Sequence, residues 1–459
     1  MKNLSLQRFN WPYSKRTIYM QGRMEMKRSL LLKTMLCMSL IQSASAYDVI
    51  DRYKLIEDKL KTEAMMRPFG HDFLLDINAS MNKNALDFVD DVTKAGETQG
   101  STNDKLNAAN AVLAKYDKTE QTIKVNLNIG IPIFSFTAWD VNVKPNLRVN
   151  ADMGANIGIR SEQLTEEKII DLFGDEIPAA LETEIRKAGF FASCAANSSD
   201  SGAYGTNTCD VIEHCRATVS SPAEAVLYCN SEPLGKYVFP INAAVPNFDL
   251  FAKLDVKAGL FNEFTSGEHF FGHWNIYGLS RTDIFQKVTS SQIAAGQEIE
   301  LPKKQNTETT LQTDLKFGYK NSNYSTFLAA EEIKISKMKE RETGSKEQSY
   351  GYDPLIRFHA DALYRWNVLS IQPFLGVHKR SGYGFSDGMY LGADAGAHVW
   401  GDRLGLMLRG MVDKQYLTLT PRVKLWLMQL EYSAKAPLKS TDGDTKLSAI
   451  HSIDLRFFF

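Results

Sequence analysis

Histidine is the side chain most suited to acid–base chemistry near neutral pH, and here most histidines fall in segments that read as strands. His269 and His273 are four residues apart, a spacing that would set both imidazoles on one face of a helix. On a strand that spacing separates them by about 13 Å, at roughly 3.3 Å per residue, which is too far for one metal ion. His378 has Ser370 and Ser381 nearby in the sequence, but no glycine-rich nucleophile elbow accompanies it.

The remaining signals for chemistry are also absent from the sequence. It contains no phosphate-binding loop, dinucleotide fingerprint or paired-cysteine zinc pattern. His359 and His398 stand on the polar side of alternating segments, where we expect them to line an interior rather than to catalyse a reaction. We therefore expect a protein that is not an enzyme and that needs no cofactor and no metal.

Residues 26–46 read as a secretory signal peptide. Lys27 and Arg28 supply the positive start, 30–41 the short apolar core, and Ala44-Ser45-Ala46 the cleavage site. The apolar core is too short to span a bilayer, so the sequence predicts an exported chain that loses this segment.

Residues 1–25 are polar and basic, which is unusual before such a signal. We interpret them as an upstream extension, with Met26 or Met24 as the true start. A signal peptide with a long positive region is the alternative.

Four cysteines remain after the signal peptide, all in one stretch rich in Ser, Asn and Gly: Cys194, Cys209, Cys215 and Cys229. An even number of cysteines in an exported chain predicts two disulfides, and the sequence does not choose among the three pairings. A zinc site is the competing interpretation. The stretch lacks C-x-x-C pairs, and His214 is its only nearby histidine, so we favour disulfides.

The bulk composition limits the class of protein. The net charge of −1 gives no reason to expect nucleic acid as a partner. The mean hydropathy is −0.27, and no run of 18 apolar residues occurs after residue 46, which argues against a helical membrane protein. A β-barrel is compatible with these values, because only every second residue of its strands faces lipid.

Strict two-residue alternation runs through most of the mature chain. In Val141–Arg160 the odd positions are apolar, while most even positions are Asn, Lys, Arg or Asp. A strand with this pattern has one apolar and one polar face. Similar segments recur at 123–131, 248–260, 311–320, 356–366, 391–399, 404–412, 417–425 and 453–459, and less regularly at 269–284, 324–338, 368–380 and 428–435.

A soluble β-sandwich also alternates, but two features favour a transmembrane barrel. Several segments exceed the usual five or six residues of a strand, and their polar faces carry charges in mid-strand, as a water-filled interior would.

Short and long links alternate between these segments, as they do in transmembrane barrels. The short links are 134–140, 263–268, 321–323, 366–367, 401–402 and 426–427. The long links are 81–120, 161–246, 285–309, 339–353, 381–388 and 437–447, with 413–415 as a short exception. One further strand near 71–80 makes the count fourteen and places both termini in the periplasm. Without it the count is lower and odd, and 47–120 becomes a periplasmic or plugging segment.

Two of the long links carry helical patterns. Residues 83–117 and 165–189 have apolar residues three and four apart, and Pro178 is expected to break the second segment into two helices. Helices that fold over the extracellular rim are the simpler interpretation. A plug or lid that gates the lumen is the alternative.

The last residues, HSIDLRFFF, resemble the terminal strand of Gram-negative outer-membrane β-barrels, which the barrel-assembly machinery recognises. The matching positions are Ile453, Leu455, Phe457 and Phe459. The hairpins over 404–437 also resemble the end of the fatty-acid-transporter and TraF-like barrels. That likeness implies fourteen strands and an N-terminal segment that can plug the pore. Pro421 stands where that family usually has glycines, and no binding residue is carried across.

The sequence thus predicts an all-β, up-and-down transmembrane barrel of about 14 strands (12–14), with helical insertions. We divide the chain into an N-terminal segment, 47–120, and the barrel, 121–459, which includes an extracellular disulfide-bearing loop, 161–246. The expected surroundings are outer-membrane lipids and the assembly machinery, and nucleic acid is not expected. The sequence does not determine the oligomeric state.

Charged residues on the polar faces are the candidates for lining the lumen: Lys144, Arg148, Asp152, Lys253, Asp255, Lys257, Arg357, Asp361, Arg365, Arg409, Arg422, Lys424 and Arg456. They would suit a porin-like channel or transporter for small solutes, with a preference for anions because basic residues predominate. Alternatively, they pair across strands and only fix the interior. A surface or adhesion barrel that transports nothing, and a plugged transporter of hydrophobic substrates, are the alternative functions.

Overall fold

The computed structural model describes residues 48–66, 73–99, 102–163, 244–290, 305–342, 349–399 and 404–458. It also describes positions 183 and 293 and the strands of a small separate sheet between 206 and 240. The predicted signal peptide, the helical pattern at 165–189 apart from position 183, Cys37, Cys194 and Phe459 lie outside the described residues.

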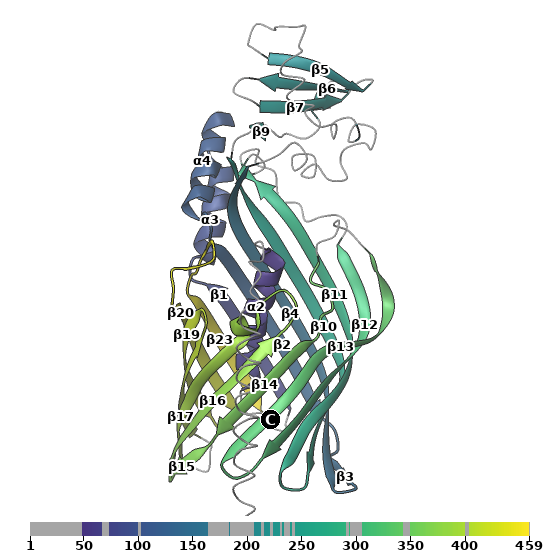
Figure 1. The fold of residues 1–459 in the computed structure, drawn as a ribbon, viewed down its shortest axis with the longest axis vertical. Coiled ribbons are helices and arrows are strands. Elements are labelled where there is room, and N and C mark those ends of the chain that lie inside the picture. Colours follow the sequence, from purple (N-terminus) through teal and green to yellow (C-terminus); the bar gives the residue numbers. More distant parts are fainter. Residues whose placement is uncertain are drawn as a thin grey trace, which may run out of the picture.

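A closed antiparallel barrel forms the body of the molecule (Figure 1). Its sheet has sixteen strands, of which β3 (Phe136–Ala138) and β15 (Tyr364–Trp366) are short extensions at hairpins, so fourteen form the wall. These are β1 (Leu74–Asn82), β2 (Glu120–Pro132), β4 (Val141–Gln163), β10 (Ala244–Ser266), β11 (Phe270–Thr289), β12 (Asn306–Lys320), β13 (Tyr324–Glu342), β14 (Leu355–Ala362), β16 (Leu369–Lys379), β17 (Met389–Val399), β18 (Leu404–Asp413), β19 (Tyr416–Leu425), β20 (Met428–Pro437) and β23 (Ile450–Phe458). The prediction of an all-β, fourteen-stranded barrel is confirmed.

The seam between the first and last strands closes as the link pattern predicts. β1 pairs with β2 on one side and with β23 on the other, and Leu74 stands opposite Phe458. Pairing of β4 with β10 over their whole 23-residue length completes the ring. The predicted strand near 71–80 therefore exists, at 74–82.

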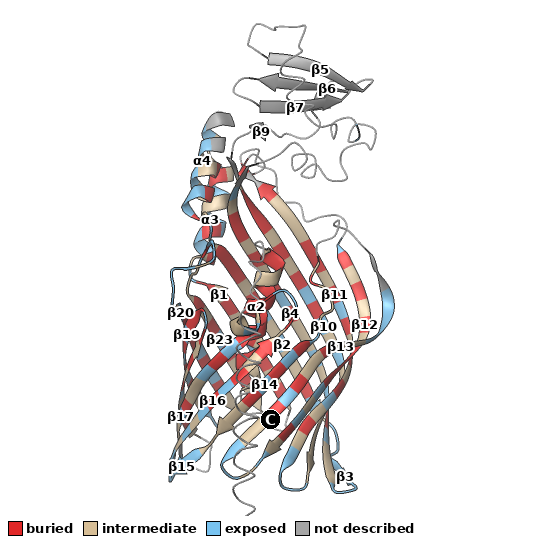
Figure 2. Ribbon diagram, in the orientation of Figure 1, coloured by how far each residue is buried: buried red, intermediate tan, exposed pale blue. Residues whose placement is uncertain are grey.

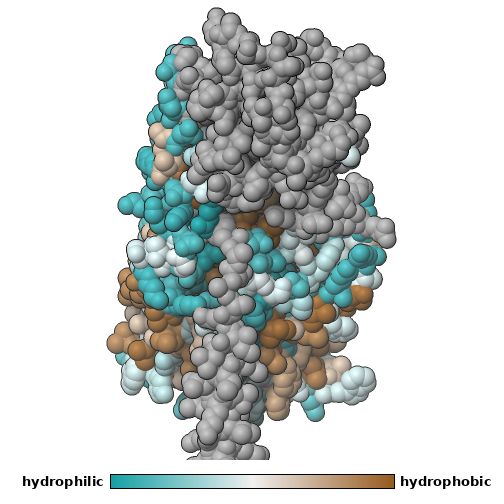
Figure 3. All heavy atoms as spheres, turned by 45° about the horizontal axis from the view of Figure 1, so that its top comes forward, coloured by the Kyte–Doolittle hydropathy of each residue, from teal (hydrophilic) through white to brown (hydrophobic). Residues whose placement is uncertain are grey.

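The barrel wall is apolar on its outer face and polar on its inner face, the reverse of a soluble protein. On β4, Leu147 and Met153 face outward and are 49% and 54% exposed, whereas Asp152 and Asn156 face inward and are 3% and 0% exposed. Figure 2 shows this alternation along most strands, and the brown regions of Figure 3 show apolar side chains gathered on the outside. Because charges point inward and leucines outward, the outer surface suits hydrocarbon rather than water.

Aromatic side chains mark the end of the barrel that carries the short turns. Trp139, Trp366 and Trp426 are 97%, 60% and 67% exposed at three of these turns. Positive backbone φ angles at Trp139 and Asp140 (47° and 63°) bend the first turn in the sense that two-residue hairpins need. Exposed tryptophans at the edge of an apolar belt are typical of a membrane interface.

The long and short links alternate around the ring as predicted, and Lys414–Gln415 is the short exception at the long-link end. Short elements within or beside the links are η2 (Phe385–Gly388), β21 (Thr441–Asp442) and β22 (Thr445–Lys446). The link between β4 and β10 holds a separate sheet of β5 (Thr206–Ile212), β6 (Cys215–Ser220), β7 (Glu224–Cys229), β8 (Glu232–Pro233) and β9 (Phe239–Pro240).

The helical pattern at 83–117 becomes an antiparallel pair, α3 (Ala85–Gly96) and α4 (Thr102–Lys115). Phe88 and Leu113 pack on Ile159 and Phe248, which point outward from β4 and β10 near the long-link end. This pair therefore covers the outside of the wall where its longest strands extend beyond the shorter ones, and it does not enter the lumen.

One further helix, α2 (Val49–Met65), lies inside the barrel. No helix is expected at these residues from the sequence patterns described above. No helix among the described residues is long and apolar enough to cross a membrane.

Candidate functional site

The candidate site is the barrel interior around α2. Asp48 caps the helix by accepting a 2.8 Å hydrogen bond from the Ile50 amide. Twelve of its seventeen residues are buried, and they include Glu57, Asp58 and Lys59. A helix buried on all sides with so many charges must find a charged partner for each, because an unpaired buried charge costs several kcal/mol.

The first turns of α2 pack against aromatic side chains and a glycine in the barrel interior. Tyr53 packs on Phe251 and Tyr350, with ring centroids 5.3 and 6.3 Å away. A Cβ added at Gly154 would lie 1.8 Å from the Tyr53 hydroxyl, so only glycine leaves room for this ring. Asn156 donates a 3.1 Å hydrogen bond to the Val49 carbonyl oxygen.

Arg52 connects the same end of the helix to the rim. Its guanidinium donates to Glu120, the first residue of β2, at 3.0 Å, and to Asp442 in the β20–β23 link at 2.6 Å. Both partners lie at the long-link end, so the N-terminal end of α2 points there. Residues 1–47 lie outside the described residues, and the periplasmic location of the N-terminus stays a prediction.

Glu57 is an anion of α2 that binds three ammonium groups and one hydroxyl. Lys253 of β10 donates to it at 2.8 Å, and Lys124 of β2 donates at 3.3 Å. Lys61, one turn further along α2, lies at 2.9 Å, and the Tyr350 hydroxyl donates at 2.6 Å. Burial works to raise the pKa of this carboxyl, but the three ammonium groups outweigh burial and hold the pKa well below its usual range.

Asp58 and Lys59 bind other sectors of the wall. Arg380, just after β16, donates two hydrogen bonds of 3.0 and 3.1 Å to Asp58, and Tyr383 donates one of 2.9 Å. Burial opposes ionisation of Asp58, yet Arg380 and Lys61 lower its pKa. Lys59 donates to Asp413 at 2.7 Å and to Gln415 at 2.8 Å, across the turn between β18 and β19.

A second anionic centre, Glu332 of β13, binds the helix from the wall. Lys61 of α2 and Lys257 of β10 lie 3.0 and 2.9 Å from one of its oxygens, and Arg380 lies 2.9 Å from the other. Glu332 has a positive φ of 60° in mid-strand, at an irregular stretch of the β12–β13 register. This irregular pairing between β12 and β13 turns the Glu332 carboxylate toward α2.

The last turn of α2 ends on the opposite wall. Lys435 of β20 forms an ion pair with Glu63. Arg409 of β18 donates 3.2 Å hydrogen bonds to the carbonyl oxygens of Glu63 and Met66, which the end of a helix leaves without partners. Met66 packs against Phe374 and neighbouring rings.

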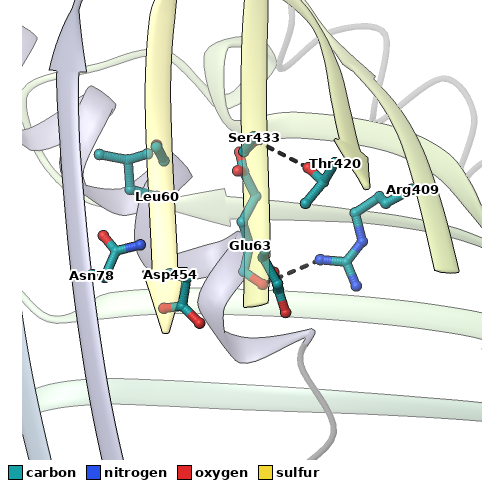
Figure 4. Close-up of a pocket in the computed structure, with 9 residues that line it drawn as sticks. Leu60, Glu63, Asn78, Arg409, Thr420, Ser433 and Asp454 are labelled. Atoms are coloured by element: carbon teal, nitrogen blue, oxygen red, sulfur yellow. Dashed lines mark hydrogen bonds between the residues drawn. The ribbon is translucent and has the colours of Figure 1, made fainter. Parts of the chain in front are cut away.

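A cavity of about 20 Å³, enough for roughly one water molecule, separates this turn from the wall (Figure 4). Polar groups surround it, and Figure 4 shows Glu63 between Arg409 on one side and Asp454 and Asn78 on the other. The contact between helix and wall is therefore polar here as well.

The sequence-predicted lumen residues fall into three groups. Lys253, Lys257, Arg357 and Arg409 touch α2 or share an acid with it. Cross-strand or near-neighbour partners hold Arg148, Asp152, Asp255, Asp361, Arg422 and Arg456. Lys144 and Arg365 are exposed at the short-turn end, and Lys424 is half-buried there.

The predicted excess of cations does not describe the wall. The lumen candidates named from the sequence leave out acidic wall residues that the structure buries inside, among them Glu120, Glu332, Asp394, Asp413 and Glu431. With these acids counted, most cations are neutralised, and the expected preference for anions loses its basis.

Three of the residues considered in the sequence for chemistry, His378, Ser381 and His359, make structural contacts. His378 Nδ1 is 2.9 Å from the Tyr383 hydroxyl, and the Ser381 hydroxyl donates to Asp353 at 2.5 Å. His359 lies against the rings of Phe327 and Phe374. Among the described residues, no group of three or more His, Cys, Asp or Glu side chains is arranged to hold a metal ion.

The remaining predicted site residues are placed as follows. The register of β6 and β7 sets Cys215 opposite Cys229, while the side chains of all four cysteines lie outside the described residues. Ile453, Leu455 and Phe457 stand at alternate positions of β23, with Ile453 56% exposed on the outside.

The closed ring, the outward apolar belt and the tryptophans at its edge decide the class. The chain is an outer-membrane β-barrel. No known family model matches it, and no curated relative does.

Similar solved structures include the transport unit of the autotransporter AIDA-I from Escherichia coli (TM-score 0.33, 6% identity, 90% of this chain and 99% of that chain covered). CdiB from Acinetobacter baumannii (TM-score 0.31, 7% identity, 84% and 60% covered) and a mutant Rh. blastica porin (TM-score 0.19, 8% identity, 84% and 99% covered) are also similar. At these TM-scores the likeness carries no argument about function. The resemblance to fatty-acid-transporter and TraF-like barrels finds no support in these three structures and stays a hypothesis.

Proposed function

We propose that this barrel is a gated channel or transporter for small hydrophilic solutes, closed at rest by α2 and opened when α2 is displaced. The observation that carries the proposal is the ring of contacts around the helix. Charged groups of α2 bind β2, β10, β13, β18 and β20, which lie on different sides of the lumen. Seventeen residues at about 1.5 Å each give a plug roughly 25 Å long, most of the thickness of a membrane.

The chemistry of this interface supports a plug that can leave. Buried ion pairs add little net stability, because desolvation offsets most of their attraction. If α2 moves out, water can solvate both the helix and the wall charges. A core of leucines would instead expose apolar surface at about 25 cal/mol per Å². The polar wall also favours hydrophilic solutes over hydrophobic ones.

The alternative is a barrel that α2 fills permanently. The partners of Glu57 and Asp58 favour it, since both carboxylates are fully buried and multiply bonded. The separate sheet in the β4–β10 link also suits a surface or adhesion protein that transports nothing.

Conductance in planar bilayers tests whether α2 is what closes the lumen. We expect the full chain to be silent or to open rarely, and a variant lacking residues 48–66 to give stable, ohmic openings. Anomalous gel migration before boiling would show that the shortened barrel is folded. A folded variant that stays silent would overturn the proposal.

A tether tests displacement without shortening the chain. Lys59→Cys and Asp413→Cys, in a background with the native cysteines replaced by serine, would be joined by a short bismaleimide. We expect the joined protein to stay closed in acid or denaturant that opens the same variant before joining. Equal opening in both states would mean that the helix is not the gate.

A further inference from the structure

A second cavity lies beyond the C-terminal end of α2, between the helix and the wall. Its volume is about 190 Å³. Met65 and Met66 contribute from the helix, and six strands contribute Phe271, Lys316, Ser325, Phe327, His359, Asp361, Gln372, Phe374 and Asp394. For comparison, an apolar protein cavity of about 150 Å³ holds a benzene molecule.

Flat rings form much of the cavity wall. His359 stacks between Phe327 and Phe374, at centroid distances of 5.3 and 5.8 Å. Phe271 meets Phe327 edge-on at 6.5 Å. With the flexible side chains of Met65 and Met66, these rings make an apolar surface suited to another ring.

The acids of the cavity already have partners. Asp361 accepts hydrogen bonds from Ser325 at 2.5 Å and from Gln372 at 2.9 Å. Asp394 accepts two from Arg409, at 2.7 and 2.8 Å. Protein donors therefore engage both carboxylates, and the cavity is not suited to a cationic ligand.

Lys316 differs from these groups. Its ammonium lies 4.2 Å from the ring centre of Phe327 and 5.4 Å from that of Phe271. Within the described part of the chain, no carboxylate lies within ion-pair distance of it. The cavity thus combines an apolar, ring-lined wall with one ammonium group that forms no ion pair with a described residue.

We propose that this cavity binds a small organic anion with one aromatic ring and a carboxylate. The carboxylate would meet the Lys316 ammonium, and the ring would lie among Phe327, Phe374 and Met65. Such a ligand would reach the cavity from the short-turn end of the barrel. The proposal goes beyond gating, because the cavity exists with α2 in place.

Binding of benzoate to the full chain in lipid nanodiscs tests the proposal, with benzamide and benzylamine as neutral and cationic analogues. Calorimetry should show saturable binding of benzoate, weaker by about tenfold or more for benzamide and absent for benzylamine, since a charged hydrogen bond contributes about 1.5–3 kcal/mol. Equal affinity for all three ligands, or no saturable binding of benzoate, would overturn it.

Variants locate the site. Lys316→Met should weaken benzoate binding about tenfold or more, whereas Lys316→Arg should retain most of it. Lys144→Met removes a cation in the same half of the barrel that does not line the cavity, and it should change nothing. Unchanged binding in folded Lys316→Met would place the ligand elsewhere. The comparison of the three ligands on the unmodified protein remains decisive if that variant fails to fold.

Discussion

Glu57→Gln is the sharpest perturbation of the plug. The carboxylate is completely buried and faces Lys253, Lys124 and Lys61 at 2.8, 3.3 and 2.9 Å. Glutamine keeps the size and can still accept the Tyr350 hydrogen bond, but it removes the charge that compensates three ammonium groups. Removing one partner of a buried ion pair costs about 3–5 kcal/mol.

This cost falls on the docked helix, because displacement lets water solvate the lysines. A change of about 3 kcal/mol shifts the ratio of displaced to docked helix roughly 150-fold, and about 5 kcal/mol shifts it roughly 4,000-fold. Single-channel recording should therefore show open probability rising by two orders of magnitude or more, with the conductance of each opening unchanged.

The matched control breaks an ion pair of the wall itself. Asp76→Asn removes the partner of Arg456, 2.8 Å away across β1 and β23, without touching α2. It should lower resistance to thermal unfolding and leave open probability low. If Glu57→Gln stays silent, or if both variants open equally, the idea that these charges hold a gate is refuted.

Three further predictions follow from the same contacts. The pKa values of Glu57 and Asp58 are lower when the helix is docked than when it is displaced. Docking therefore keeps its full stability at pH values above the ordinary carboxylate pKa, and it weakens as the pH falls toward and through the lowered pKa values of the docked helix. Recordings should stay silent from pH 8 to 5 and show openings only below about pH 4; openings that increase instead toward alkaline pH would contradict this. Gly154→Ala places a Cβ against the Tyr53 hydroxyl and should weaken docking by about 1–3 kcal/mol, measured as a higher open probability. The control Gly278→Ala should be neutral, because the new Cβ would lie 3.9 Å from the Ala258 carbonyl oxygen; equal behaviour of the two variants would count against the fit of Tyr53. Peptide mapping without reduction should find Cys215 joined to Cys229, because these residues stand opposite each other on β6 and β7. Cys194 would then pair with Cys209. A Cys209–Cys215 bond would show that the β6–β7 register does not decide the disulfide pairing.

Much of the barrel could be predicted because its physics is local. Alternation at 141–160 requires only that one face meets lipid and the other the lumen, and β4 follows it. For β1, the expectation of a strand rests on counting the short and long links between strands rather than on the alternation of apolar and polar residues. The helical pattern at 83–117 is also visible in the sequence, since Ala85, Phe88 and Val92 stand three and four residues apart, as do Ala109 and Leu113 further on.

The plug could not be predicted in this way. α2 is charged around most of its circumference, its apolar stripe of Val49, Tyr53, Ile56 and Leu60 is narrow, and its partners are far away in the sequence. Glu57 meets Lys253 and Tyr350 only because the barrel closes around them. Besides this stripe, 48–66 is rich in helix-forming residues and has acids and bases three and four apart, with Asp48 as a cap.

The position of α2 immediately before β1 also constrains how the molecule folds. Closing the seam joins β1 to β23, and Arg456 reaches Asp76 across 380 residues of chain. Contacts so distant in sequence form slowly, because the entropy of a very large loop must be overcome first. A helix already bound to β10, β13 and β18 would gather these strands before the ends meet. In that sequence of events the plug is a template for the wall, and a chain without it should close its barrel more slowly.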